Sequence, residues 1–172
     1  VLPSQATTRM REAPETRLRL ELDRCTGTEE RRQLLIRLSG VLADRARDYP
    51  AAIATLEEAL TLQATPDVLA RLGDVCRLAG RFAAAARWYV KAAHYAAPAG
   101  STLPPMSGDL RLSWLRDGIE LAIRCGELEL AASALVELDE NESSLRRSRA
   151  ALHKLAPDYV DQITASSDWI YL

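Results

Sequence analysis

The chain has 172 residues and a net charge of −2, with 48% hydrophobic and 27% charged residues. A chain of this length and composition can bury a core without disulfides or metal ions. Its 28 alanines and 27 leucines, beside a single phenylalanine, are typical of helices and argue against a β-sandwich or β-barrel. The balanced charge is unlike the strongly basic footprint of a nucleic-acid-binding domain.

The N-terminal part has two features that bear on its interpretation. It contains neither an initiator methionine nor the apolar run of a secretion signal, which favours a fragment of a longer protein. Processing of the chain would have the same result. Residues 15–25 alternate leucine with charge, as strands do. Pro14 at a first-turn position and the lack of β-branched residues favour a helix there instead.

The middle of the chain contains an internal repeat with an offset of 33 residues. Residues 40–59 and 73–92 carry similar residue types at equivalent places. The paired positions are Gly40 with Gly73, Tyr49 with Phe82, Ala52 with Ala85, Leu56 with Tyr89, Ala59 with Ala92, Ile36 with Leu69, and Ala43 with Cys76.

This repeat predicts two closely packed helices joined by a tight turn. Gly40 and Gly73 are expected to be the small residues of the first helices that let the second helices approach. The turn is expected at residues 48–50 in the first copy and 80–82 in the second. Gly80 suits the left-handed conformation that ends a helix. The second helices then present a small, a large and another small residue on one face.

The pattern resembles the tetratricopeptide repeat (TPR) family, in which a Leu-Gly pair, an aromatic turn residue and a small-large-small face recur. The second copy matches at Leu69, Leu72, Gly73, Gly80, Phe82, Ala85, Tyr89 and Ala92. The first copy has Ser39 before Gly40 and no turn glycine. The resemblance implies an all-α fold, a right-handed superhelical solenoid of antiparallel helix hairpins.

A third, degenerate copy follows a break in the pattern. It fits the template at Leu115, Gly118, Gly126, Leu128, Ala131, Leu135 and Leu138, with Gly118 one place from its expected position. Prolines and glycines between residues 94 and 109 forbid a regular helix and place an insertion before this copy. Its helices are expected at about 109–125 and 128–139. Leucines in residues 143–155 favour a terminal capping helix.

These observations give an expected organisation within one domain. It comprises an N-terminal helical segment (1–28), repeat 1 (29–65), repeat 2 (66–98), an insertion loop (99–108), a degenerate repeat 3 (109–141), and a capping helix with an apolar tail (142–172).

The sequence shows no catalytic, metal or cofactor motif. His94 and His153 are far apart and lie among surface-like residues. Cys76 and Cys125 are interpreted as core thiols, and three widely spaced cysteines indicate a reducing, cytoplasmic compartment. Trp114 is expected in the core, Trp88 in a seam or on the convex side, and Trp169 in a docked tail or a partner surface. We therefore expect a protein that is not an enzyme and needs no cofactor.

The resemblance also implies where a partner binds, because the first helices of such repeats line a concave face. The equivalent positions are Arg37, Val41, Asp44 and Arg45 in the first copy, Asp67, Ala70, Asp74, Arg77 and Leu78 in the second, and Arg116, Glu120, Ile123 and Arg124 in the third. Arg37, Arg77 and Arg116 are expected to face one groove. Arginines there would bind carboxylates of a partner. Alternatively, these arginines and acids pair with each other on a solvated face.

Family members that clamp chaperone C-termini use lysine and asparagine where this chain has Arg37, Val41 and Arg71, so that partner is not expected. The leading hypothesis is a non-catalytic protein-interaction module of a bacterial scaffold or adaptor. It would bind a peptide or protein on the concave face or the repeat edges. The alternatives are a ligand- or peptide-sensing regulatory domain and a self-association module. Neither nucleic acid nor membrane insertion is expected, since no apolar run is long enough to span a bilayer.

Overall fold

The computed structural model describes residues 13–95, 108–136, 150 and 153–155 of the chain. Within these residues the regular secondary structure is helical and contains no strand, which confirms the predicted all-α class. Contacts along the chain divide it into two units, residues 1–64 and 65–172. Each unit is described by itself below.

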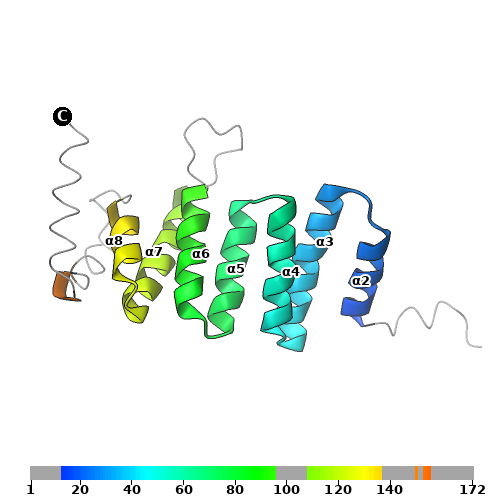
Figure 1. Cartoon of the computed structure of the whole chain (residues 1–172), viewed down its shortest axis with the longest axis horizontal. Helices are drawn as coiled ribbons and strands as arrows, with labels where there is room; N and C mark the ends of the chain where they lie inside the picture. The colour runs from blue at the N-terminus through cyan, green and yellow to red at the C-terminus, as the bar shows by residue number, and fades with distance from the viewer. Residues whose placement is uncertain (1–12, 96–107, 137–149, 151–152, 156–172) are drawn as a thin grey trace, which may run out of the picture. The chain divides into compact units, whose positions relative to one another are not determined.

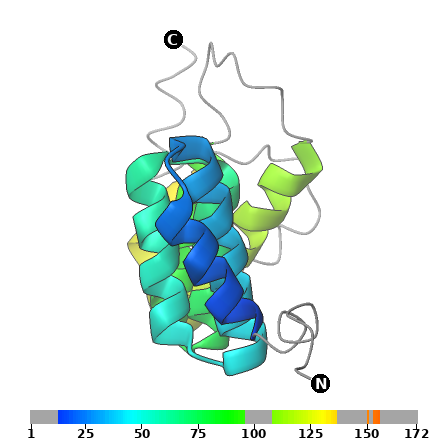
Figure 2. The same ribbon diagram turned by 90° about the vertical axis from the view of Figure 1, so that its right-hand side faces the viewer.

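The described residues of unit 1 form three α-helices and one π-helical turn. These are α2 (Pro14–Arg24), α3 (Thr28–Val41), the π-helical turn η1 (Leu42–Ala46) and α4 (Tyr49–Leu62). Helix α3 packs against both α2 and α4 (Figure 1, Figure 2). The alternating run at residues 15–25 forms a helix, as predicted, and Pro14 lies in its first turn. Leu18 and Leu22, one turn apart, are its buried residues.

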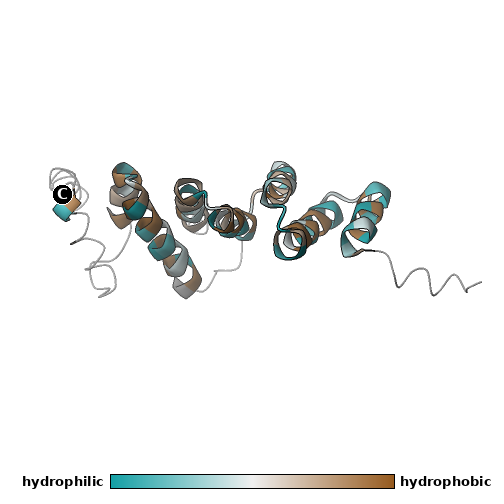
Figure 3. Cartoon of the chain, turned by 90° about the horizontal axis from the view of Figure 1, so that it is seen from below, coloured by the Kyte–Doolittle hydropathy of each residue, from teal (hydrophilic) through white to brown (hydrophobic). Residues whose placement is uncertain are grey.

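Unit 2 contains α5 (Pro66–Leu78), α6 (Phe82–Tyr95), α7 (Gly108–Cys125) and α8 (Leu128–Val136). The last two agree with the helices expected at about 109–125 and 128–139, as far as the described residues reach. Helix α6 packs against both α5 and α7, and α7 also packs against α8 (Figure 1). Hydrophilic and hydrophobic residues alternate along these ribbons, as expected of amphipathic helices (Figure 3).

Several expectations lie outside the described residues. They concern the first twelve residues, residues 99–107 of the insertion loop, most of the capping helix, and the apolar tail with Trp169.

Helix α6 is buried on two sides because small residues on its neighbours let it approach closely. An added Cβ at Gly73 of α5 would lie 2.8 Å from the ring of Tyr89. An added Cβ at Gly118 of α7 would lie 2.8 Å from Cγ2 of Val90 and 3.3 Å from the carbonyl oxygen of Ala86. The predicted close-approach role of Gly73 is confirmed. The small-large-small face (Ala85, Tyr89 and Ala92) is fully or almost fully buried.

Gly118 has a different role from the one expected of it. The template gave it the position of Gly73, which contacts the second helix of its own hairpin. Gly118 instead contacts α6, the second helix of the preceding hairpin. Gly118 lies one place from the position equivalent to Gly73, and it faces a different helix. It therefore does not reproduce the contact that Gly73 makes.

Gly40 is a second correction. A Cβ placed there would meet no atom within 4 Å, so this glycine is not a point of close helix approach. Leu56, at the place of Tyr89, is fully buried, but it is a shorter side chain without a ring. The preceding residue, Ser39, is buried, and its hydroxyl donates to the carbonyl oxygen of Ile36 at 2.7 Å. The first hairpin therefore lacks the glycine-under-ring contact.

The turns of unit 2 close in the same way. Gly80 and Gly126 have φ angles of 73° and 77°, as predicted for a glycine that ends a helix. After α5, the backbone N–H of Arg81 donates to the carbonyl oxygen of Cys76, and the N–H of Gly80 donates to that of Arg77. After α7, the N–H groups of Glu127 and Gly126 donate to backbone carbonyls at the same spacings. This pair of bonds satisfies carbonyls that the helix end leaves open. The same motif therefore ends both helices.

The turn of unit 1 closes differently. Arg47, at the place of Gly80, takes the left-handed conformation with a φ of 54°. The turn before it is π-helical, and the N–H groups of both Arg47 and Asp48 donate to the carbonyl of Leu42. A non-glycine residue in this conformation costs about 1 kcal/mol. The turn predicted at residues 48–50 is thus shifted, because Tyr49 and Pro50 already belong to α4.

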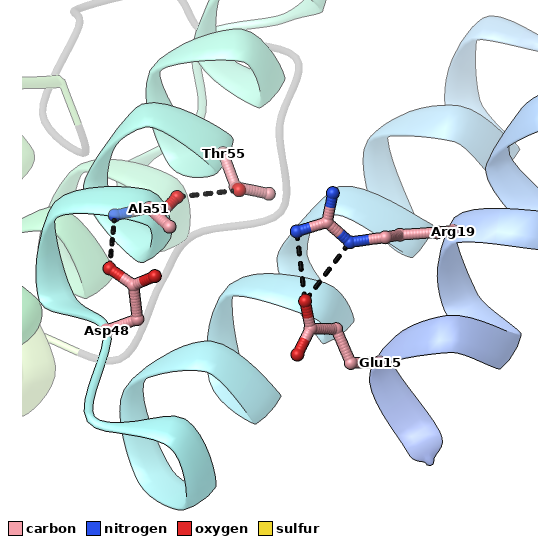
Figure 4. A network of polar contacts seen from close by, with 5 residues as sticks. All are labelled: Glu15, Arg19, Asp48, Ala51 and Thr55. Carbon is pink, nitrogen blue, oxygen red and sulfur yellow. Dashed lines mark hydrogen bonds and ion pairs between the residues drawn. The ribbon is translucent and has the colours of Figure 1, made fainter. Parts of the chain in front are cut away.

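Helix α4 begins with a side-chain cap. The Asp48 carboxylate accepts a hydrogen bond from the backbone N–H of Ala51 at 3.1 Å (Figure 4). Such a cap satisfies one of the donors left open at a helix N-terminus. The same figure shows Arg19 of α2 donating to Glu15, one turn earlier on the same helix. Exposed pairs of this kind contribute a few tenths of a kcal/mol.

Candidate interaction surface

The residues predicted to line a binding face are for the most part at the surface. Those exposed are Arg37, Asp44, Arg45, Asp67, Asp74, Arg77, Leu78, Arg116, Glu120 and Arg124. Val41 and Ile123 are half-buried. Ala70 is buried, which corrects its expected place on the binding face. It lies on the packing side of α5, so no partner can reach it.

In unit 1 the predicted face lies beside α2. An oxygen of Glu21 in α2 lies 4.0 Å from the Arg37 guanidinium, and the same carboxylate accepts a hydrogen bond from Arg17. Arg37 therefore already has a carboxylate neighbour within its own unit. Arg31 of α3 forms a closer link, donating to Glu58 of α4 at 2.7 Å. In unit 1 these arginines therefore have acidic neighbours on adjacent helices, and such exposed pairs contribute little to stability.

In unit 2 the exposed residues of α5 and α7 meet above a tyrosine of α6. The Tyr89 hydroxyl donates to the Asp74 carboxylate at 2.6 Å. The ring of the same tyrosine lies over Gly73, so one side chain both packs on α5 and orients an acid at its surface. Burial, followed by the Asp74 carboxylate, raises the pKa of Tyr89 far above its ordinary value. The hydroxyl therefore stays protonated, and able to donate, at a higher pH than an ordinary tyrosine hydroxyl.

Asp117 of α7 lies next to this pair. Loss of water around its carboxylate raises its pKa, although the residue as a whole is exposed. Glu120 and Asp74 raise the pKa further, while Arg77 and Arg116 act against them. Residues of α5 and α7 therefore share one electrostatic environment. We call the residues Asp74, Arg77, Arg116, Asp117, Glu120 and Arg124 the α5–α7 face.

This arrangement bears on the expectation that three arginines share one groove. Arg77 and Arg116 both lower the pKa of Asp117, so both lie within electrostatic range of its carboxylate, and their sharing of a groove stays a prediction. Arg37 belongs to unit 1, and its place beside them stays a prediction. Two arginines of the face also have acidic neighbours. The Arg124 guanidinium lies 2.6 Å from the Glu120 carboxylate, and the Arg77 guanidinium lies 3.8 Å from the Asp74 carboxylate. These pairs are exposed, so a partner can compete for them at little cost.

The sequence analysis missed one residue of the face and the role of the tyrosine beneath it. Asp117 was not among the positions that the TPR pattern places on the binding face. Tyr89 was assigned to packing, and its hydroxyl was not considered. A signal was present in the sequence: the equivalent position holds Leu56, and a tyrosine there requires a partner for its hydroxyl.

The cysteines differ from one another. Cys76 is buried, as predicted, whereas Cys125 is exposed because it lies at the last turn of α7, before Gly126. None of the three cysteines is in a disulfide. In the described part of the chain, His, Cys, Asp and Glu side chains form no group able to hold a metal ion. No helix there has both the length and the apolar character needed to cross a bilayer.

Comparison with known proteins provides no relative for this chain. No family model, no curated protein and no solved structure matches it.

Proposed function

We propose that the chain is a non-catalytic protein-interaction module of a scaffold or adaptor, built as a TPR-like solenoid of helix hairpins. The observation that carries the proposal is the α5–α7 face. Its three acids and three arginines come from two helices and are each exposed, and one of the acids, Asp74, accepts a hydrogen bond from a buried tyrosine. Arginines on such a face bind carboxylates in a two-pronged geometry, and fixed acids bind basic side chains.

The rigidity of this surface supports a binding role. Tyr89 is 2% exposed and fixed between Gly73 and Asp74, and α7 is held against α6 at Gly118. Partner-binding groups supported in this way lose little conformational freedom on association. The free thiols support a reducing compartment such as the cytoplasm.

Charge reversal on the face tests the proposal. The protein carrying Arg77→Glu and Arg124→Glu is compared with one carrying Arg17→Glu, an exposed arginine of α2 that also neighbours an acid on its own helix. Cross-linking of the full-length protein in its own cells, followed by mass spectrometry, identifies partners. We expect the first variant to lose a partner that the wild type and Arg17→Glu both retain. Equal retention by all three would contradict the proposed face.

A further inference from the structure

The turn between α5 and α6 exposes large apolar side chains that the other turns within the described residues do not. Leu78 and Phe82 are 54% and 47% exposed. The residues in register with Leu78 are Arg45, 33 places earlier, and Arg124, 46 places later. The residues in register with Phe82, Tyr49 and Leu128, are both half-buried. Exposed apolar residues that lie close together mark binding surfaces more often than isolated ones do.

The residue that precedes α6 also departs from the other turns. Asp48 precedes α4 and caps it, and Glu127 precedes α8. Acidic residues are favourable at these places because the helix N-terminus carries partial positive charge. Arg81 stands at the corresponding place before α6, where its charge is unfavourable for the helix. Residues that are unfavourable for their local structure are expected where they have a functional role.

Along the chain, the charge from this turn through α6 has one sign. From Gly80 to Tyr95 the sequence contains Arg81, Arg87 and Lys91 and no aspartate or glutamate, whereas Arg77, before the turn, is paired with Asp74. One acidic side chain from another part of the chain lies against this segment. Glu127, which precedes α8, accepts a charge-assisted hydrogen bond from Arg87. A complementary partner for the turn is therefore acidic.

We propose that Leu78, Arg81 and Phe82, here called the α5–α6 tip, bind an acidic polypeptide segment that carries a large apolar side chain. The apolar side chain would contact Leu78 and Phe82, and a flanking carboxylate would pair with Arg81. The proposal rests on the interaction function proposed above and places a contact at a repeat edge. Phenylalanine and arginine are both enriched in protein interfaces.

The test uses a fluorescent synthetic peptide of glutamates with two leucines, titrated into the full chain. Binding is followed by anisotropy and mapped by amide NMR shifts. The informative variants are Leu78→Arg and Arg81→Asp, because each introduces a residue that the chain itself carries in register at another turn. Arg24→Asp, at an exposed arginine in the last turn of α2, is the control.

We expect shifts centred on residues 77–84 and a loss of affinity of about tenfold or more for both tip variants. Arg81→Asp should also raise the melting temperature, since it supplies a cap, so weaker binding cannot be ascribed to unfolding. Peptides with serine for leucine, or lysine for glutamate, should bind at least about tenfold more weakly.

Four results would each overturn the proposal: no saturable binding, unchanged affinity of Arg81→Asp, an equal loss in Arg24→Asp, or equal competition by a single-stranded oligonucleotide. The interaction function itself is tested separately, by the cross-linking experiment with Arg77→Glu and Arg124→Glu. If the tip variants lose peptide binding but still cross-link to the cellular partner, the tip and the α5–α7 face are two different sites.

Discussion

The hairpins α3–α4 and α5–α6 have the same residue spacing but different contacts. In the second hairpin, Gly73 lies under the ring of Tyr89 and Gly80 closes the turn. In the first, a Cβ added at the corresponding Gly40 would meet no atom within 4 Å, and Arg47 takes the left-handed conformation after a π-helical turn. Matching spacing thus predicts that two helices pair, while the size of the facing side chain decides how closely they pack.

The largest contrast is expected from alanine at the two glycines. Gly73→Ala places a methyl group 2.8 Å from the Tyr89 ring and should lower the free energy of unfolding by about 1–3 kcal/mol. Gly40→Ala meets open space and gains helix propensity, so it should raise stability by up to about 1 kcal/mol. Urea unfolding of both variants measures the difference. Equal destabilisation would show that the hairpins pack alike.

Gly118 extends the comparison to the contact between hairpins. Gly118→Ala crowds a stiff valine side chain and the backbone of α6, neither of which can move freely. We expect a loss of about 1–3 kcal/mol, detected as a lower urea midpoint. An unchanged urea midpoint would show that the contact between α6 and α7 does not require a glycine at this position.

The left-handed turn residues should respond in opposite directions. Arg47→Gly relieves a strained conformation and should stabilise unit 1 by about 1 kcal/mol, whereas Gly80→Ala should destabilise unit 2 by a similar amount. Hydrogen exchange of amides in α4 and α6 reports on each unit separately. If Arg47→Gly left the exchange in α4 unchanged or faster, the strain at Arg47 would not limit that unit.

The hydroxyl of Tyr89 is a smaller contribution with a pH signature. Tyr89→Phe removes the hydrogen bond to Asp74 and should cost about 0.5–1.5 kcal/mol at neutral pH. The folded protein raises the pKa of Tyr89, so the unfolded tyrosine ionises first, near its ordinary pKa of about 10. Stability should therefore fall as the pH rises above about 10, and less steeply in the variant. Parallel pH profiles for the two proteins would contradict this assignment.

Asp117 should give the smallest effect. Because folding raises the pKa of its carboxyl, the ionised form is disfavoured in the native state at neutral pH. Asp117→Asn should slightly raise the melting temperature at pH 7, and the gain should disappear as the pH falls and wild-type Asp117 becomes protonated. A gain that persisted at low pH would point to packing instead of charge.

Much of the fold could be predicted from sequence because it depends on local signals. Periodicity gave the helices, Pro14 decided helix against strand, and Gly80 and Gly126 marked two helix ends. The sequence could not show which helix a small residue faces. Gly40, Gly73 and Gly118 all fit the repeat pattern. Gly73 faces the second helix of its own hairpin, Gly118 faces the preceding hairpin, and a Cβ at Gly40 would meet neither.

The candidate surface could be predicted only in part. The resemblance to the TPR pattern implied a surface position for Asp74, Arg77, Arg116 and Glu120, and each of them is exposed. It could not show that Tyr89 reaches Asp74 or that Asp117 lies near Arg77, because those contacts join different helices. The burial of Ala70 depends on tertiary packing in the same way.

A double-mutant cycle between Gly73 and Tyr89 tests the central structural claim most directly. Gly73→Ala is measured by urea unfolding in the wild type and in a Tyr89→Leu background, which mimics Leu56 of the first hairpin. If the ring is what the methyl group meets, the cost of Gly73→Ala should shrink by about 1 kcal/mol or more in the leucine background. Additive costs, within about 0.5 kcal/mol, would contradict the claim that the second hairpin is built on this contact.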